Sequence, residues 1–261
     1  MTTFDAERFR ALARDAKPKL GRPLHYQPVT GSTNDDALAA ARSGAPHGSL
    51  FVADEQTRGR GRRGNTWLAA PGESLLFSVL LRPELELSQV SALTLAIGLA
   101  LRDAIAPHIS AEAQLKWPND LYVGGKKLSG VLVESQLQGD RLQAVVVGIG
   151  LNVTTRDFPL EIAARATSLS LLGAAALERE PLLHELLSAI AVRVEAYERA
   201  GVAGILDELH AADALRGQRI RVDGASGPSG LASGFDSQGH LQLLDDTGQT
   251  HAISSGTIEL L

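Results

Sequence analysis

The sequence predicts an α+β fold in which a large first domain, residues 1–215, precedes a small C-terminal β-barrel, residues 216–261. Three observations predict it. The 261 residues are 44% hydrophobic, enough to bury a substantial core. Helical and strand periods alternate through the first domain. Short strands separated by Gly, Ser, Pro and Asp turns fill the last part, which is near the lower size limit for folding alone.

The elements follow from the spacing of apolar residues and from the residues that bound each run. Residues 91–106 are apolar almost all round, as in a helix packed on a sheet. Pro181 opens a long helix and Gly201 closes it. Gly124 and Gly125 form a hairpin turn. We expect helices over residues 4–16, 33–43, 91–106, 181–199 and 204–215, strands over 24–29, 50–54, 74–81, 115–123, 127–134 and 142–153, and barrel strands over 219–222, 230–235, 240–244 and 250–253.

Composition excludes several classes of protein and site. The chain has no cysteine, so disulfides and thiolate sites are impossible, and its seven histidines lack the spacing of a zinc site. A formal charge of −5 argues against a duplex nucleic-acid binder. The N-terminus has no signal-peptide pattern, and the apolar run 91–106 is shorter than the roughly 20 residues of a membrane span. We expect a soluble cytoplasmic protein that binds neither DNA nor a membrane.

The stretch Glu55–Trp67 interleaves four arginines with three glycines. Glycine opens backbone conformations that other residues avoid, and the arginine fork matches carboxylate and phosphate. The run is either a solvated basic surface loop or a lid that closes over a phosphate-bearing ligand. Its Gly-x-Gly-x-x-Gly spacing matches the dinucleotide-binding fingerprint, but no apolar helix begins there, so we interpret the match as chance.

The segment Ser32–Asn34 begins a helix and is a second candidate site. Capping by Ser32 or Thr33, with acids in the first turn, explains these residues structurally. Alternatively, the free backbone N–H groups and two hydroxyls bind a polar ligand. Both interpretations stay open at this point.

The segment Lys116–Asp120 contains a proline inside a strand-like run. Pro118 lacks an N–H and restrains Trp117 to extended geometry. It marks either a bulge that aims Asn119 and Asp120 into a cavity or a simple turn. A carboxylate beside a carboxamide can hold a magnesium ion with its waters, so Asp120 is a candidate Mg²⁺ ligand.

Two later strands carry further candidates. Lys127 lies at the mouth of one strand, and strand alternation directs Lys126 the other way. Gly148 and Gly150 give up packing within a buried strand, which indicates a close-lying ligand. Asn152 follows them and could face the same cavity.

Together, five motifs resemble those of biotin protein ligases: Gly31–Asn34, Gln56 with the Arg/Gly run and Trp67, Lys116–Asp120, Lys127–Gly130 and Gly148–Asn152. Each is weak alone, whereas five in register across residues 24–155 are specific. The resemblance implies a mixed sheet flanked by helices, akin to class II synthetase catalytic domains, followed by an SH3-like barrel. It implies activation of biotin by Mg-ATP to biotinyl-5′-AMP, and transfer to a lysine of a biotin carboxyl carrier protein, such as the acetyl-CoA carboxylase subunit.

The resemblance also assigns residues to roles. Lys127, Arg62 and Arg60 would be catalytic, Trp67 would stack on adenine, and Asp120 would hold Mg²⁺. The biotin-binding residues would be Ser32, Thr33, Asn34, Gln56, Gly59, Arg60, Gly61, Arg62, Lys127, Gly130 and Gly148. The ATP-binding residues would be Arg62, Trp67, Asn119, Lys127 and Asn152.

The chain departs from the family pattern at Asn65, where the loop commonly carries another arginine. Thirty-one residues precede Ser32, so we expect the type without a winged-helix DNA-binding domain, as a monomer or weak homodimer. Two alternative functions remain to be weighed against biotin ligation. A lipoyl or octanoyl ligase shares the fold and the adenylate chemistry, but the Arg/Gly run favours biotin. A non-enzymatic module could grip single-stranded RNA, but Trp67 is the only aromatic residue in the run.

Overall fold

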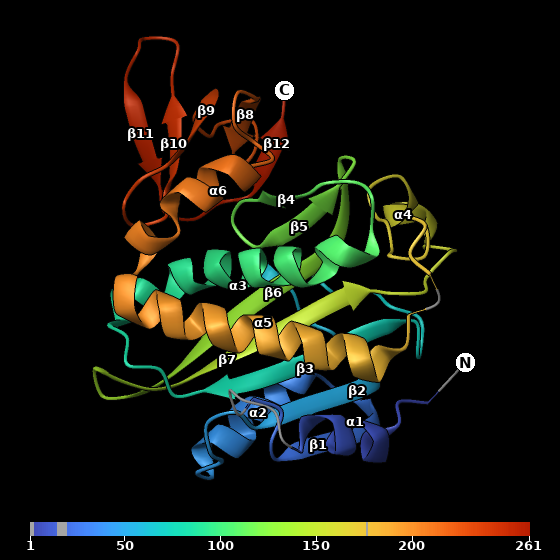
Figure 1. Cartoon of the computed structure of the whole chain (residues 1–261). Helices are drawn as coiled ribbons and strands as arrows, with labels where there is room; N and C mark the ends of the chain where they lie inside the picture. The colour runs from blue at the N-terminus through green and yellow to red at the C-terminus, as the bar shows by residue number, and fades with distance from the viewer. Residues whose placement is uncertain (1–2, 15–19, 176) are drawn as a thin grey trace.

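The computed structural model describes residues 3–14, 20–175 and 177–261, and these form two sheets (Figure 1). The large sheet has the strand order β1-β2-β3-β7-β6-β5-β4. It is mixed, because β1 and β2 pair in parallel while the other neighbours are antiparallel. The strands are β1 (Leu24–Thr30), β2 (Leu50–Gln56), β3 (Ser74–Leu81), β4 (Ala113–Lys116), β5 (Asp120–Val123), β6 (Lys126–Gln138) and β7 (Arg141–Asn152). The predicted mixed α+β sheet is confirmed.

Helices cover both faces of the large sheet (Figure 1). Odd-numbered residues of the central strands, such as Val79 and Val147, join the main core with α3 and α5. Even-numbered residues, such as Leu80 and Val146, pack with Ala37 of α2 on the opposite face. The helices are α1 (Ala6–Ala13), α2 (Thr33–Arg42), α3 (Val90–Ile105), α4 (Leu160–Ala163), α5 (Arg179–Ala200) and α6 (Leu206–Ala212).

The α2 face of β3 and β7 changes character along its length. Beneath α2 it is apolar, with Leu80 and Val146. Further along, the same face presents Ser78, Gly148 and Gly150, which are small or polar. Side chains of alternate residues share a face, so the strands themselves leave a hollow beyond the end of the apolar patch.

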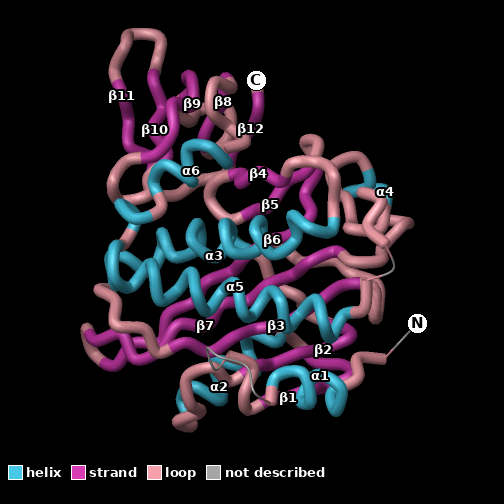
Figure 2. Tube along the Cα trace, in the orientation of Figure 1, coloured by secondary structure: helices cyan, strands magenta, loops and turns pink. Residues whose placement is uncertain are grey.

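The C-terminal sheet is antiparallel and lies against the end of the large sheet that carries β4 and β5 (Figures 1 and 2). Its last strand returns to pair with its first, so that Ile258 lies opposite Val222. The Trp117 indole N–H donates to the Gly239 carbonyl across the junction, at 3.3 Å. The order is β11-β10-β9-β8-β12, with β8 (Arg219–Val222), β9 (Ser229–Phe235), β10 (Leu241–Leu244), β11 (Thr250–Ile253) and β12 (Ile258–Leu260). This arrangement is consistent with the expected small barrel.

The apolar helix is longer than predicted. One-turn 3₁₀ segments extend α3 at both ends, so the helical stretch Leu87–His108 has 22 residues and is apolar enough to span a membrane. In the fold, 67% of its apolar window is buried, and α3 packs on α5 and β6. Its hydrophobicity is therefore that of a core helix.

Two other expectations need adjustment. Residues 115–123 are not one strand, because β4 and β5 form a hairpin whose turn is Trp117–Asn119. Pro118 thus lies in a turn, the second of the two alternatives that the sequence left open, and not in a bulge. The first helix is described over Ala6–Ala13, and the predicted residues 15 and 16 fall outside the described part of the chain.

Candidate active site

A cavity of about 410 Å³ lies over the hollow on the α2 face of the large sheet. Its floor comes from β6 and β7, and the β4–β5 turn forms one side. A segment that we call the Arg/Gly loop, residues 58–67, covers it. Gly256, Thr257 and Ile258 of the C-terminal sheet complete the wall. Segments almost 200 residues apart in sequence therefore enclose one cavity.

The Arg/Gly loop has a defined backbone. Arg60 and Thr66 form an isolated antiparallel bridge, and the Gly61 N–H donates to the Asn65 carbonyl at 2.7 Å. A single 3₁₀ turn, η1 (Arg62–Gly64), occupies the tip. Glycines at 59, 61 and 64 permit this tight return, and Gly64 has a positive φ of 79°. The loop is thus a short hairpin, not a helix start, which confirms that the dinucleotide fingerprint was chance.

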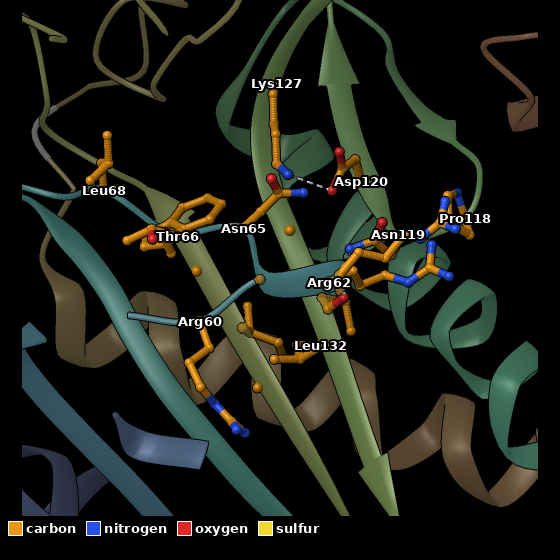
Figure 3. Close-up of a pocket in the computed structure, with 18 of the residues that line it drawn as sticks. Arg60, Arg62, Asn65, Thr66, Leu68, Pro118, Asn119, Asp120, Lys127 and Leu132 are labelled. Carbon is orange, nitrogen blue, oxygen red and sulfur yellow. Dashed lines mark hydrogen bonds and ion pairs between the residues drawn. The ribbon is translucent and has the colours of Figure 1, made fainter. Parts of the chain in front are cut away.

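The loop arginines point to different partners (Figure 3). Arg60 extends away from Lys127 and forms ion pairs with Glu134 and, at 3.3 Å, with Asp35. Arg62 lies beside the β4–β5 turn instead. Arg60 was expected to act with Arg62 and Lys127, but its side chain points away from Lys127 toward Glu134.

Lys127 meets Asp120 across the cavity, with Nζ 2.6 Å from Oδ1 (Figure 3). The same ammonium lies 5.5 Å from the centroid of the Trp67 ring. A bulge between β5 and β6, at Leu121 and Tyr122, shifts the alternation so that Lys127 and the even-numbered residues of β6 face the cavity. Lys126 is exposed outside it. Lys127 therefore lines the cavity and Lys126 does not, whereas the catalytic role of Lys127 stays a prediction.

Three further cations line the cavity around Asp120: Arg62, Lys116 and Arg165. Among the described residues, none of the three has an acidic partner within ion-pair distance. Burial lowers the pKa of Lys116 and of Arg62, and in both cases the nearby Asp120 opposes that shift. Burial, with a smaller contribution from the Asp120 charge, raises the pKa of Tyr122 to about 12. Arg62 and Lys116 are partly desolvated and have no ion-pair partner among the described residues. With the more exposed Arg165, they make this end of the cavity a site for anions.

The opposite end of the cavity is lined mainly by uncharged polar groups, and Arg60 at that end is paired with Asp35 and Glu134. The Thr33 N–H and hydroxyl both donate to Gln56 Oε1, at 2.8 and 3.0 Å. The Ser78 hydroxyl donates to Asn34 Oδ1 at 2.6 Å. Ser32 makes no capping bond with its side chain although it occupies the N-cap position of α2. The predicted N-cap position is confirmed, but the side chains of this segment serve the cavity and not the helix end.

The two glycines of β7 have partners within the protein. A Cβ at Gly148 would lie 1.9 Å from Asn34 Oδ1, and one at Gly150 would lie 2.4 Å from the Trp67 ring. A Cβ at Gly130 would lie 3.1 Å from the same ring. All three glycines also line the cavity, so their contact with a ligand stays a prediction. They admit Asn34 and Trp67, which then line the cavity.

The Trp67 indole forms part of the cavity lining, and its Nε1–H is buried without a hydrogen-bond partner among the described residues. Buried indole N–H groups usually have one. The vacant donor is consistent with a ligand or water beside it. A ring on the glycine floor, under the Lys127 ammonium, also offers a flat surface for stacking.

The remaining predicted residues have mixed positions. Asn119 lines the cavity, and its amide donates to the Val131 carbonyl at 2.9 Å. Asn152 also lines it, but its Nδ2 donates to Thr167 O at 2.9 Å. Gly61 and Gly130 line the cavity. Gly59, at the start of the loop, does not, and a Cβ there would lie 2.7 Å from the Trp67 carbonyl oxygen.

Some residues that form or support the cavity were not predicted from the sequence, and Glu134 supports it without lining it. Glu134 ties the Arg/Gly loop to the floor, because it pairs with Arg60 and accepts from Asn34 Nδ2 at 2.8 Å. Its even position on β6 could have identified it. Arg165 and Thr257 stand in segments without a local pattern, so only the fold brings them to the cavity.

Comparisons with known proteins agree with this geometry. Residues 26–152 match the model of the Biotin/lipoate A/B protein ligase family. The chain is 38% identical over 244 residues to the biotin–[acetyl-CoA-carboxylase] ligase of Mycobacterium tuberculosis, covering 91% of this chain and 88% of that protein. It is 36% identical over 246 residues to the bifunctional ligase/repressor BirA of Bacillus spizizenii, covering 92% and 75% respectively.

Solved structures give the same result. The fold matches the biotin protein ligase of Aquifex aeolicus in complex with biotin and ATP, with a TM-score of 0.79 and 31% identity. That match covers 92% of this chain and 99% of the other. On these sequence and structural matches, the chain belongs to the biotin protein ligase family and is a ligase.

Proposed function

We propose that this protein activates biotin as biotinyl-5′-AMP and transfers it to a lysine amine of a biotin carboxyl carrier protein of acetyl-CoA carboxylase. The observation that carries the proposal is the asymmetry of the cavity. Lys127, Lys116 and Arg62 lie near Asp120 at one end. Uncharged hydrogen-bonding groups predominate at the other, where Arg60 is already paired with acids. This suits a ligand with an uncharged ureido ring and a carboxylate that must approach a triphosphate.

The first step joins two anions. A carboxylate oxygen of biotin attacks the α-phosphorus of ATP, the bond from that phosphorus to the pyrophosphate oxygen breaks, and pyrophosphate leaves. The Lys127 ammonium and Arg62 guanidinium would neutralise the repulsion and stabilise charge on the equatorial oxygens. Such groups contribute about 3–4 kcal/mol each in comparable transition states. Lys116 and Arg165, which line the same cavity, would hold the departing pyrophosphate.

The second step forms an amide. The neutral carrier-lysine amine attacks the acyl carbon, the acyl–oxygen bond breaks, and AMP leaves with that oxygen. The amine gives up a proton in the step. Cover by the Arg/Gly loop would limit hydrolysis of the mixed anhydride before the carrier arrives.

The biotin end would be formed by Ser32, Thr33, Asn34 and Gln56, with Gly130 in the adjoining wall. Trp67 would carry the adenine by stacking on its exposed face. Asn152 would contact the nucleotide by packing against it, because its amide N–H already donates to the Thr167 carbonyl.

Magnesium would arrive with ATP. Among the described residues, no cluster of three or more histidine, aspartate or glutamate side chains could cage a metal. The donors present, the Asp120 carboxylate and the Asn119 amide oxygen, fit an ion that takes most of its ligands from phosphates and water. When bound, Mg²⁺ would neutralise phosphate charge.

The decisive experiment is mass spectrometry of an apo carrier domain after incubation with the protein, Mg-ATP and biotin, in parallel with lipoate or octanoate. The proposal predicts a biotinyl mass gain on the carrier lysine and none with the other acids. A gain with lipoate alone would replace biotin by the lipoyl alternative. No gain with any acid would refute the proposal.

A further inference from the structure

We infer that the C-terminal sheet holds the Arg/Gly loop over the cavity through Arg63 and Asp223, and that these two are positioning residues for Arg62. We call this contact the clasp. The inference deepens the proposed function and rests on it, because it concerns retention of the adenylate.

The clasp joins segments 160 residues apart. Arg63 Nη1 forms an ion pair with Asp223 Oδ1 and lies 3.2 Å from Thr257 Oγ1. Arg63 Nη2 lies 3.5 Å from Asp223 Oδ2, so the fork faces both carboxylate oxygens. The Thr257 N–H donates to Asp223 Oδ1 at 2.9 Å. The acid is therefore held by its own sheet before it meets the loop.

The backbone conformation of Arg63 and Asp223 indicates that the two residues have a functional role. Arg63 and Asp223 have φ values of 55° and 57°, and they are the two non-glycine residues with positive φ in the described part of the chain. The left-handed region of φ and ψ costs less free energy for glycine than for a residue with a Cβ, such as Arg63. Strain of this kind is commonly associated with functional segments. The Arg63 side chain supplies a contact that glycine could not.

The clasp acts on the catalytic end of the cavity through a single turn. Arg62 and Arg63 are neighbours in η1, and Arg62 lines the cavity while Arg63 reaches the C-terminal sheet. Thr257, which contacts both residues of the clasp, lines the same cavity. The sheet is also fixed to the β4–β5 turn by the Trp117–Gly239 hydrogen bond. Loss of the clasp would free η1, and with it Arg62.

A role in folding stability alone is disfavoured by exposure. The Arg63 and Asp223 side chains are 50% and 43% exposed, and exposed ion pairs contribute little to stability. The same sheet offers a matched control in Arg219–Asp246, an ion pair whose side chains are 51% and 70% exposed and which lies away from the cavity. The clasp should therefore affect ligand retention, and the control pair should not.

The test compares release of biotinyl-AMP from preloaded wild type, Asp223→Asn and Asp246→Asn. Asparagine at 223 keeps an acceptor for the Thr257 N–H but removes the ion pair. We expect release to accelerate by about 10- to 100-fold in Asp223→Asn, since a misplacement of about 1 Å can have effects of up to about 100-fold. Asp246→Asn should match wild type. Thermal midpoints should differ little among the three.

The direction of the change in release rate distinguishes the clasp from a purely electrostatic effect of the Asp223 charge on the ligand. Removing a negative charge near an anionic ligand should by itself slow release. Release that is unchanged or slower in Asp223→Asn would therefore overturn the inference. Arg63→Gln combined with Asp223→Asn should be no worse than the more affected single variant, because both remove the same contact. Additive effects would also contradict the clasp.

A second measurement needs no ligand chemistry. Trypsin cleaves after arginine, and a freed loop should be cut faster in ligand-free Asp223→Asn than in wild type or Asp246→Asn. If wild type makes no adenylate but this difference appears, the proposed function fails and the clasp contact stands. Equal cleavage rates would overturn the clasp even if the wild type is an active ligase.

Discussion

At the residue scale, the environment of each cation decides its role. Arg60 and Arg63 are neutralised by acids outside the anion end of the cavity, whereas Arg62, Lys116 and Arg165 keep their charge for a ligand. Sequence spacing identified the Arg/Gly run but could not separate its members. Their partners stand on β6 and on the C-terminal sheet, far along the chain.

Lys127 and Lys126 form an internal pair for mutagenesis. We expect Lys127→Gln to slow adenylate formation by about 10²–10³-fold, because it removes a preorganised charge at the reacting oxygens. Lys126→Gln, on the outward face, should leave the rate within about twofold, as for ordinary surface substitutions. Pyrophosphate release in a single turnover measures both. Equal losses in the two variants would contradict the assignment.

The glycines of β7 predict a crossed pattern of substrate affinities. Gly148→Ala should displace Asn34 and raise the KM for biotin, because the added Cβ would lie 1.9 Å from its amide oxygen. Gly150→Ala should displace Trp67 and raise the KM for ATP, since the new Cβ would lie 2.4 Å from the ring. Initial-rate kinetics with each substrate varied would show the pattern. The opposite assignment of the two effects would refute it.

At the element scale, polarity on one face of the sheet locates the site. The sequence predicted β3 and β7 as buried strands, and that is confirmed. The sequence could not predict which end of each strand would pack under a helix and which under a loop. The alternation of apolar residues identifies the two faces of a strand but not the element that packs on each. The β5–β6 bulge had no signal in the sequence, although it helps to place Lys127.

Element packing near the N-terminus depends on Asp54, at the end of the apolar part of β2. Its carboxylate pairs with Arg179 of α5 at 2.7 Å and accepts from the Tyr26 hydroxyl at 2.6 Å. We expect Asp54→Ala to lower the free energy of unfolding by about 3–5 kcal/mol, as for other broken buried pairs. Urea denaturation would measure this.

The matched control is Glu178→Ala. Glu178 forms an exposed ion pair with Arg8 between α1 and the start of α5, so its loss should change stability little. Equal destabilisation by the two substitutions would show that burial does not govern the Asp54 contact.

At the scale of the whole molecule, the second sheet is part of the site. Strands β8 to β11 were predicted from turn residues, and their existence is confirmed, whereas β12 was not predicted. The approach of Thr257 to the cavity was not predicted, because no local pattern specifies docking between segments so distant in sequence. The division of the chain into domains at residue 215 stays a prediction.

The junction of the two sheets contains a buried acid, Asp213. Burial raises its pKa above the ordinary value, although the Leu215 N–H opposes the shift. The folded state therefore binds its proton more tightly than the unfolded state, and stability falls as pH rises through the folded pKa. We expect Asp213→Asn to be more stable than wild type by about 1 kcal/mol at neutral pH, since it removes a desolvated charge.

This advantage should disappear below the ordinary aspartate pKa of about 4, where both states of the wild type are protonated. Thermal midpoints from acid to neutral pH would measure it. Asp207→Asn, on the exposed side of α6, serves as the control. A constant difference between Asp213→Asn and wild type at every pH would contradict the titration.

The central claim is that the cationic end of the cavity joins a carboxylate to the α-phosphorus of ATP. The most direct measurement uses biotin labelled with oxygen-18 in its carboxylate, followed by mass spectrometry of the nucleotide released on transfer to the carrier. The account predicts AMP containing one oxygen-18 atom for each biotin transferred. Unlabelled AMP, or ADP with phosphate, would contradict it.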